Sequence, residues 1–285
     1  RLPFYVSSFE PHAEYMVESE VWSCWNIKLI FQRYWERQQI RYAAGLMPVS
    51  GHYRQELLNS GKLESIVKTV PSTVRVNLFV HDTVSRESIR EKLGWQSSTI
   101  GIYVGKFGDL YYKEEAFEIY RKCFELIEDF RLIILTPQPK QEILQQMVKH
   151  NLDQEKVYVA SVQHQEVPQH LSAADFAFAT YKPGPSKKAL SPVKVGEYWA
   201  NGLPVLLTEG VGDDSDIIRQ EGGGALFNLE QEGSLEDAIA QILGILKDPQ
   251  HRQQIPQLAQ KYRSPDKLRE AFEYFFGQTE REVKG

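Results

Sequence analysis

Short apolar runs alternate with longer stretches of helical periodicity over most of the chain. Runs of this kind are typical of strands that are buried on both faces. They predict strands at 99–104, 130–136, 157–160, 176–180 and 203–208. Because amphipathic segments separate these runs, the pattern indicates an α/β fold with a parallel sheet.

The segments between the runs have the start and stop signals of helices. Gly94 and Gly202 each follow a helical segment, and glycine is the usual residue just past a helix end. Ser234 is expected to cap the segment that follows it, with Asp237 in its first turn. The predicted helices are 84–93, 113–127, 141–150, 192–201, 234–247, 253–262 and 264–276, with another that starts near Ser215 or Asp216.

The chain before residue 75 has its own pattern. It predicts strands at 3–7, 41–50 and 66–70, and helices at 17–42 and 51–58. The predicted helix 17–42 mixes tryptophan and tyrosine with arginine and lysine. This mixture suits nucleic acid, a membrane surface or plain packing, of which we favour packing. We place a domain boundary near residue 75.

Composition and charge narrow the functional classes. A chain of 285 residues, 42% of them hydrophobic, is long enough for two domains with sizeable cores. The net charge of −5 argues against nucleic-acid binding, which needs a basic face. Cys24 and Cys123 provide neither a disulfide framework nor a metal cluster, so we expect a reducing, cytoplasmic compartment. No apolar run is long enough to span a membrane, and peripheral contact with a membrane stays open.

The stretch from Ser191 to Asp216 carries the most specific chemistry. Ser191 is expected to cap a helix whose first turn contains Pro192 and Lys194. The free N–H groups of a helix N-terminus, together with a lysine, favour an anion such as a phosphate. Glu197 lies on the apolar stripe of the same helix, and a buried carboxylate needs a partner. That partner is either Lys194 on the same helix or the hydroxyl groups of a ligand such as a ribose.

A second candidate site follows the strand predicted at 99–104. Gly105 and Lys106 open a glycine loop that ends at Gly108, and Lys113 follows shortly after. A glycine loop with cations after the first strand of a Rossmann-like domain suits a pyrophosphate. Solvated surface lysines are the alternative, because the loop is not the dinucleotide-binding fingerprint.

The segment SPVKVGEYWANGLPV resembles the nucleotide-sugar signature of GT-B glycosyltransferases, most closely the group 1 or GT4-like family. The matching positions are Ser191, Pro192, Lys194, Glu197, Tyr198, Ala200, Gly202, Pro204 and Val205. The segments at 104–113, 166–175 and 221–227 also resemble steps of that family, the last of them as an edge strand. One departure is Ala189, which stands where the family's E-x7-E motif has its first glutamate.

The resemblance implies an α/β architecture of GT-B type, with two Rossmann-like domains that face each other across a cleft. We expect an incomplete N-terminal, acceptor-side domain at 1–75 and a C-terminal, nucleotide-sugar-binding domain at 76–262. The last helix, at 263–285, is expected to pack back towards the N-terminal domain. Because the chain opens inside a strand, we also expect roughly 100 further residues of the first domain before Arg1. A chain truncated in this way could bind the donor without turning it over.

The resemblance also implies an activity. It is transfer of a hexosyl group from a nucleotide-sugar donor to a hydroxyl group of a glycan or lipid-linked acceptor, with retention of configuration. This chemistry belongs to polysaccharide biosynthesis, and neither a metal ion nor another cofactor is expected. Lys106, Lys113 and the helix N-terminus could neutralise the leaving diphosphate in place of a metal.

Site residues are carried over by matching positions. The donor-binding residues would be Gly105, Lys106, Lys113, Ser191, Pro192, Lys194 and Glu197. Glu197 would bind the ribose of the donor. His12, in the loop after the first strand, is the catalytic candidate, and Glu10 and Glu14 are weaker ones. The loop at 181–188 could cover the donor, with Lys187 or Lys188 compensating for Ala189, or it is a mobile solvated loop.

Two other functional classes stay open. Another GT-B enzyme, such as a nucleotide-sugar epimerase or a phosphorylase, would need carboxylates or a phosphate-binding lysine that the sequence does not single out. A degenerate nucleotide-binding or partner-binding module without activity is favoured by Ala189. Glu166 and Asp175 are interpreted as structural, and His164 and His170 as incidental.

Overall fold

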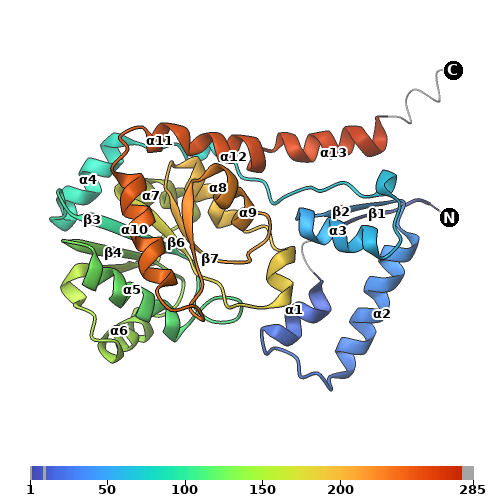
Figure 1. Ribbon diagram of the computed structural model, residues 1–285, viewed down its shortest axis with the longest axis horizontal. Helices are drawn as coiled ribbons and strands as arrows, with labels where there is room; N and C mark the ends of the chain where they lie inside the picture. Colours follow the sequence, from blue (N-terminus) through green and yellow to red (C-terminus); the bar gives the residue numbers. More distant parts are fainter. Residues whose placement is uncertain (1, 9–10, 278–285) are drawn as a thin grey trace.

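The computed structural model describes residues 2–8 and 11–277, so that Glu10 lies outside the described residues. Figure 1 shows a larger unit on one sheet and a smaller unit on another. The units are joined by an extended stretch before α4 (Thr83–Leu93) and by a long helical segment made of α12 (Pro256–Arg263) and α13 (Asp266–Phe276). Among the described residues, no helix is long and apolar enough to cross a membrane.

The larger sheet has six parallel strands in the order β5-β4-β3-β6-β7-β8. Their bounds are β3 Thr99–Val104, β4 Phe130–Leu135, β5 Val157–Ala160, β6 Phe176–Ala179, β7 Val205–Thr208 and β8 Gly224–Phe227. The strands predicted from the apolar runs are confirmed, and β8 is an edge strand. The strand order reverses between β3 and β6, and such a switch point is where open α/β sheets bind ligands.

Helices cover both faces of this sheet and enclose two apolar cores. One face carries α4 Thr83–Leu93, α7 Val167–Ala173, α8 Val193–Ala200, α9 Asp214–Glu221, α11 His251–Gln254 and α12 Pro256–Arg263. The other carries α5 Glu114–Leu126, α6 Lys140–Lys149 and α10 Ser234–Leu246. Gly94 ends α4 with a φ of 71°, as predicted. Ser234 is not the cap of α10: Gly233 takes that position, and the Ser234 hydroxyl accepts the N–H of Asn228.

The smaller unit is built on a parallel pair, β1 Tyr5–Ser8 and β2 Gly45–Pro48, and it includes α3 Gly51–Asn59. The strand predicted at 66–70 does not form. That segment runs beside β2 through a single bridge between Leu46 and Val67 and two flanking backbone hydrogen bonds, after a 3₁₀ turn at Glu64–Ile66.

The single helix predicted at 17–42 is wrong. Two helices form instead, α1 His12–Glu18 and α2 Ile27–Tyr42, with a turn between them. Glu20 has a φ of 61° in this turn, a conformation that no helix continues through. Asn26 then caps α2 by accepting the N–H of Lys28.

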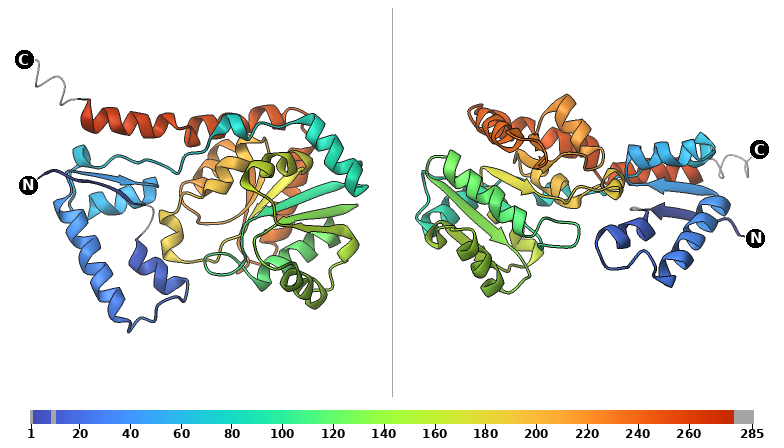
Figure 2. Two further views of the ribbon diagram at one scale, coloured as in Figure 1. Left: turned by 180° about the vertical axis from the view of Figure 1, so that it is seen from behind. Right: turned by 60° about the horizontal axis from the view of Figure 1, so that its bottom comes forward.

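The last helix, α13 Asp266–Phe276, leaves the larger unit and lies along the smaller sheet (Figure 2). The ring centroid of Phe275 is 5.4 Å from that of Tyr5 on β1. The Tyr274 hydroxyl donates to the carbonyl of Ser65 at 3.1 Å. Ala271, Met47 and Val70 complete this small core.

Candidate functional site

Loops at the carboxyl ends of β3 and β5 meet the N-terminal half of α8. The glycine loop follows β3, His164 follows β5, and Lys194 and Glu197 project from α8. The ammonium of Lys194 approaches Gly105, and the carboxylate of Glu197 bonds to His164. The structure therefore brings several of the predicted donor-binding residues together beside the switch point of the sheet.

Gly105 occupies a position that other residues would strain. Its φ is 143°, and a β-carbon there would lie 2.8 Å from the Nζ atom of Lys194. Its N–H donates to the carbonyl of Leu135, which ties the loop to β4. Lys106 is exposed and pairs with Asp109, which raises the pKa of the lysine. Lys106 thus stands at the entrance of the site with a carboxylate that a ligand would have to displace.

The Lys194 residue is half-buried, but its Nζ atom is shielded from solvent and has no hydrogen-bond partner among the described residues. It lies 3.9 Å from the ring centroid of Tyr111, 5.0 Å from that of Tyr103 and 5.7 Å from that of Tyr181. Burial lowers the pKa of Lys194 to about 7, and the negative charge of Glu197 only partly opposes this. An ammonium held by aromatic rings alone would gain most from an anion that reached it.

Glu197 is buried, and its carboxylate Oε1 lies 3.0 Å from Nε2 of His164. The pairing with Lys194 that helical spacing allowed does not form, although the two charges lie close enough to interact. The interpretation of His164 as incidental is wrong, because its ring bonds to the buried Glu197 carboxylate. Its ring also contacts that of Phe79, at 5.6 Å between centroids.

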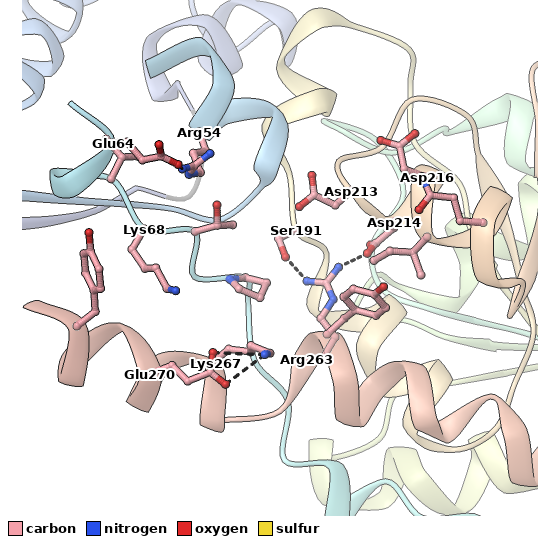
Figure 3. A pocket seen from close by; sticks show the side chains of 17 residues that line it. Arg54, Glu64, Lys68, Ser191, Asp213, Asp214, Asp216, Arg263, Lys267 and Glu270 are labelled. Carbon is pink, nitrogen blue, oxygen red and sulfur yellow. Dashed lines mark hydrogen bonds and ion pairs between the residues drawn. The ribbon is translucent and has the colours of Figure 1, made fainter. Parts of the chain in front are cut away.

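The start of α8 differs from the prediction. Pro192 is the capping residue and offers no side-chain hydrogen bond. The Ser191 hydroxyl instead accepts the N–H of Ser72 at 3.0 Å and bonds to the guanidinium of Arg263. Figure 3 shows Arg263 between Ser191 and Asp214, the carboxylate with which it forms a buried ion pair. Ser191 therefore ties the larger unit to the connecting segment, and the N–H groups of the first turn of α8 stay without a side-chain cap.

Two cavities adjoin this point. A pocket of about 660 Å³ lies between the two units on the side of α12 and α13, and Figure 3 shows its charged lining. A smaller cavity of about 100 Å³ is lined by Ser191 and Pro192 together with Tyr111 and Tyr181. The smaller cavity connects the start of α8 with the tyrosines around Lys194.

The loop at 181–188 is not a solvated loop. Residues Pro185–Ala189 form a 3₁₀ helix, η5, in which Lys187 is buried. The Lys187 ammonium lies 3.4 Å from the carboxylate of Glu18 on α1, which also accepts the N–H of Ser186 at 2.9 Å. Ala189 packs in an apolar cluster with residues of α3. Lys187 thus already has a countercharge in Glu18.

The remaining candidates lie further out. His12 is the exposed first residue of α1, and its ring centroid is 5.9 Å from that of Tyr15. Tyr15 in turn lies within electrostatic range of Lys106, so α1 faces the glycine loop. Glu14 forms an ion pair with Arg33 of α2. Lys113 is exposed and is the capping residue of α5.

The sequence did not predict the roles of His164 and Glu18. It also did not predict the cage of three tyrosine rings around Lys194, formed by Tyr103, Tyr111 and Tyr181. Each acts on a residue that is distant in sequence, so no local spacing could have identified it. In the described residues, no group of three or more histidine, cysteine, aspartate or glutamate side chains is arranged to hold a metal ion.

Comparisons with known proteins bear on the family and the fold. The model of the family described as "Glycosyl transferases group 1" matches residues 101–244, slightly more than half of the chain. No curated protein matches the sequence.

Solved structures resemble the whole chain. The Anabaena protein HepE, in complex with UDP, aligns with a TM-score of 0.69 at 14% identity, over 99% of this chain and 72% of its own. Sucrose-phosphate synthase from Thermosynechococcus elongatus aligns with a TM-score of 0.68 at 17% identity, over 99% of this chain and 68% of its own. WaaG, a glycosyltransferase involved in lipopolysaccharide biosynthesis, aligns with a TM-score of 0.65 at 16% identity, over 88% of this chain and 68% of its own. Identities this low show a shared fold and nothing finer.

Proposed function

The chain belongs to the group 1 glycosyltransferases and has a GT-B fold, and on this premise we propose that it transfers a hexosyl group from a nucleotide sugar to a hydroxyl group. We take a UDP-sugar as the first donor to test, because the similar HepE structures contain UDP or UDP-glucose. The acceptor is proposed to be a glycan or a lipid-linked glycan, with retention of configuration at the transferred carbon.

The observation that carries the proposal is the unpaired ammonium of Lys194 beside Gly105. A diphosphate that entered between the glycine loop and α8 would meet this cation and the uncapped N–H groups of the helix. Lys106 would leave Asp109 and add a second charge from the entrance. Glu197, one turn further along α8, would accept hydroxyl protons of the ribose.

In the proposed reaction, the bond between the sugar carbon and the diphosphate oxygen breaks while the acceptor oxygen forms a bond to the same carbon. The leaving diphosphate gains negative charge, which Lys106, Lys194 and the helix N-terminus would stabilise. With retention, the acceptor approaches on the face that the diphosphate leaves, so a diphosphate oxygen is the nearest base for the acceptor proton. These cations would do the work that a metal ion does in other transferases, and we propose that none is needed.

The roles that we propose for His12 and Lys113 depend on the positions of α1 and α5. His12 lies on α1, which faces the glycine loop, and we propose that it acts near the donor phosphates or the sugar. Lys113 is the second phosphate cation only if the loop that precedes α5 closes on the donor. We further propose that the protein works in the cytoplasm, in polysaccharide biosynthesis, with its acceptor at or near a membrane.

The test is calorimetric titration of the protein with UDP, GDP and ADP. We expect one nucleotide to bind, and Glu197→Ala or Lys106→Ala to weaken it about tenfold or more. Lys247→Ala, which changes an exposed lysine outside the site, is the matched control and should leave binding unchanged. A binding nucleotide then selects the sugar donors for a transfer assay. Absence of binding by all three nucleotides would favour a module without this activity.

A further inference from the structure

We infer that His164 is a positioning residue that holds the Glu197 carboxylate in the orientation needed for the ribose of the donor. The inference rests on the proposed function, because it concerns the same nucleotide site. It assigns a task to a residue in the turn after β5, which lies far in sequence from Glu197 on α8.

The contact itself is specific. Nε2 of His164 and Oε1 of Glu197 are 3.0 Å apart, and this is the only hydrogen bond of the Glu197 side chain among the described residues. The Glu197 side chain is 10% exposed, whereas that of His164 is 70% exposed. A carboxylate so deeply buried needs a donor, and the imidazole supplies it from the open side of the site. Because the acceptor is a carboxylate, Nε2 carries the proton.

The imidazole is itself held in place. His164 opens the 3₁₀ turn His164–Glu166, which is fixed by the N–H of Gln163 donating to the Glu166 carboxylate at 2.9 Å. The ring of Phe79 packs edge-on against His164 from outside this turn. A ring held in this way can fix the direction of the carboxylate that it bonds.

The alternative partner of Glu197 explains why positioning is needed. Lys194 lies one turn earlier on α8, and the charge of Glu197 already acts on it. If the carboxylate turned to that ammonium, it would cancel the cation proposed for the diphosphate and withdraw from the ribose. Bonding to His164 keeps the two charges apart. It uses one lone pair of Oε1 and leaves Oε2 and the second lone pair of Oε1 for two neighbouring hydroxyl groups.

The experiment compares binding of UDP with binding of 2′,3′-dideoxy-UDP, which lacks both ribose hydroxyls. The wild-type protein is expected to prefer UDP, and Glu197→Ala to remove the preference. His164→Ala should reduce the preference about tenfold, as expected for loss of a hydrogen bond to a charged group. His164→Gln, whose amide nitrogen can replace Nε2, should restore most of it. In the Glu197→Ala background, His164→Ala should have no further effect.

Controls separate positioning from folding. His170→Ala changes a nearby histidine, which bonds to the carbonyl of Glu166, and should leave the preference intact. If His164→Ala weakens UDP and 2′,3′-dideoxy-UDP equally, the inference is overturned while the nucleotide site stands. The same holds if Glu197→Ala removes the preference and His164→Ala keeps it. If the wild type binds none of UDP, GDP and ADP, the proposed function and this inference both fail.

Discussion

Lys194 shows how the surroundings of one side chain set its charge. Three tyrosine rings and the glycine loop enclose its ammonium, and no acceptor in the described structure bonds to it. The same lysine at the surface would be charged at any physiological pH. In this cage its pKa of about 7 leaves it poised between the neutral and the charged form until an anion arrives.

Replacing this lysine by methionine should make the protein more stable at neutral pH. The unfolded chain protonates Lys194 below about pH 10.4, whereas the folded protein does so only below about pH 7. Between these values the unfolded state binds the extra proton, so this lysine makes the wild-type free energy of unfolding rise with pH. Lys194→Met should therefore raise the free energy of unfolding by on the order of a few kcal/mol at pH 7, and this increase should shrink towards pH 10.

Urea unfolding at several pH values measures this difference. Lys247→Met serves as the control, because Lys247 is exposed and its replacement should shift stability by a small amount that does not depend on pH. Parallel pH profiles for the wild type and Lys194→Met would contradict the prediction.

At the scale of elements, α1 and η5 are held together by one carboxylate. Glu18 accepts hydrogen bonds from Ser186 and pairs with the buried Lys187, and a β-carbon at Gly184 would lie only 2.6 Å from the same carboxylate. The contact joins the smaller unit to the segment that leads directly into α8. It therefore fixes α1 against η5.

Glu18→Gln should loosen this junction. The amide keeps some hydrogen bonds but leaves the buried Lys187 ammonium without a countercharge, at a cost of about 1–3 kcal/mol. Glu14→Gln on the same helix is the control. The Glu14 and Arg33 side chains are both partly exposed, so the loss should be smaller than for Glu18→Gln. Denaturant unfolding of both variants makes the comparison, and equal losses would show that Glu18 does not stabilise the junction.

At the scale of the whole molecule, α13 returns from the larger unit and completes the core of the smaller one. Ala271 and Phe275 of α13 pack with Tyr5 and Met47 of the two-stranded sheet. Arg263 bonds to Ser191 and to Asp214 at the point where α12 gives way to α13. The C-terminal helices therefore help to fix how the two units face each other.

Phe275→Ala should destabilise the smaller unit by about 1–3 kcal/mol, less than for a fully buried phenylalanine because the ring is half-buried. The control is Phe272→Ala on the same helix, which removes an exposed ring and should cost less than about 1 kcal/mol. Thermal unfolding together with limited proteolysis of α1–α3 reports both effects. Similar protease sensitivity in the two variants would contradict a stabilising role for the return of α13.

The sequence alone determined the elements of the larger sheet. Strands such as Thr99–Val104 are buried on both faces, so their apolar runs are continuous and easy to recognise. It also indicated the family, through the residues from Ser191 to Val205, and it brought Gly105, Lys106, Lys194 and Glu197 forward as candidates. Local spacing suffices for these features because each depends on residues that are close in the chain.

The tertiary structure decided which charges meet. The hydroxyl of Ser191 bonds to Arg263 rather than capping α8, and Glu197 bonds to His164 rather than to Lys194. From the local sequence we expected Ser191 to cap α8 and allowed Glu197 to pair with Lys194. The partners that form instead lie on elements distant in sequence, which only folding brings close. A buried polar group bonds to whichever partner the packing brings within reach, and that choice does not appear in the local sequence.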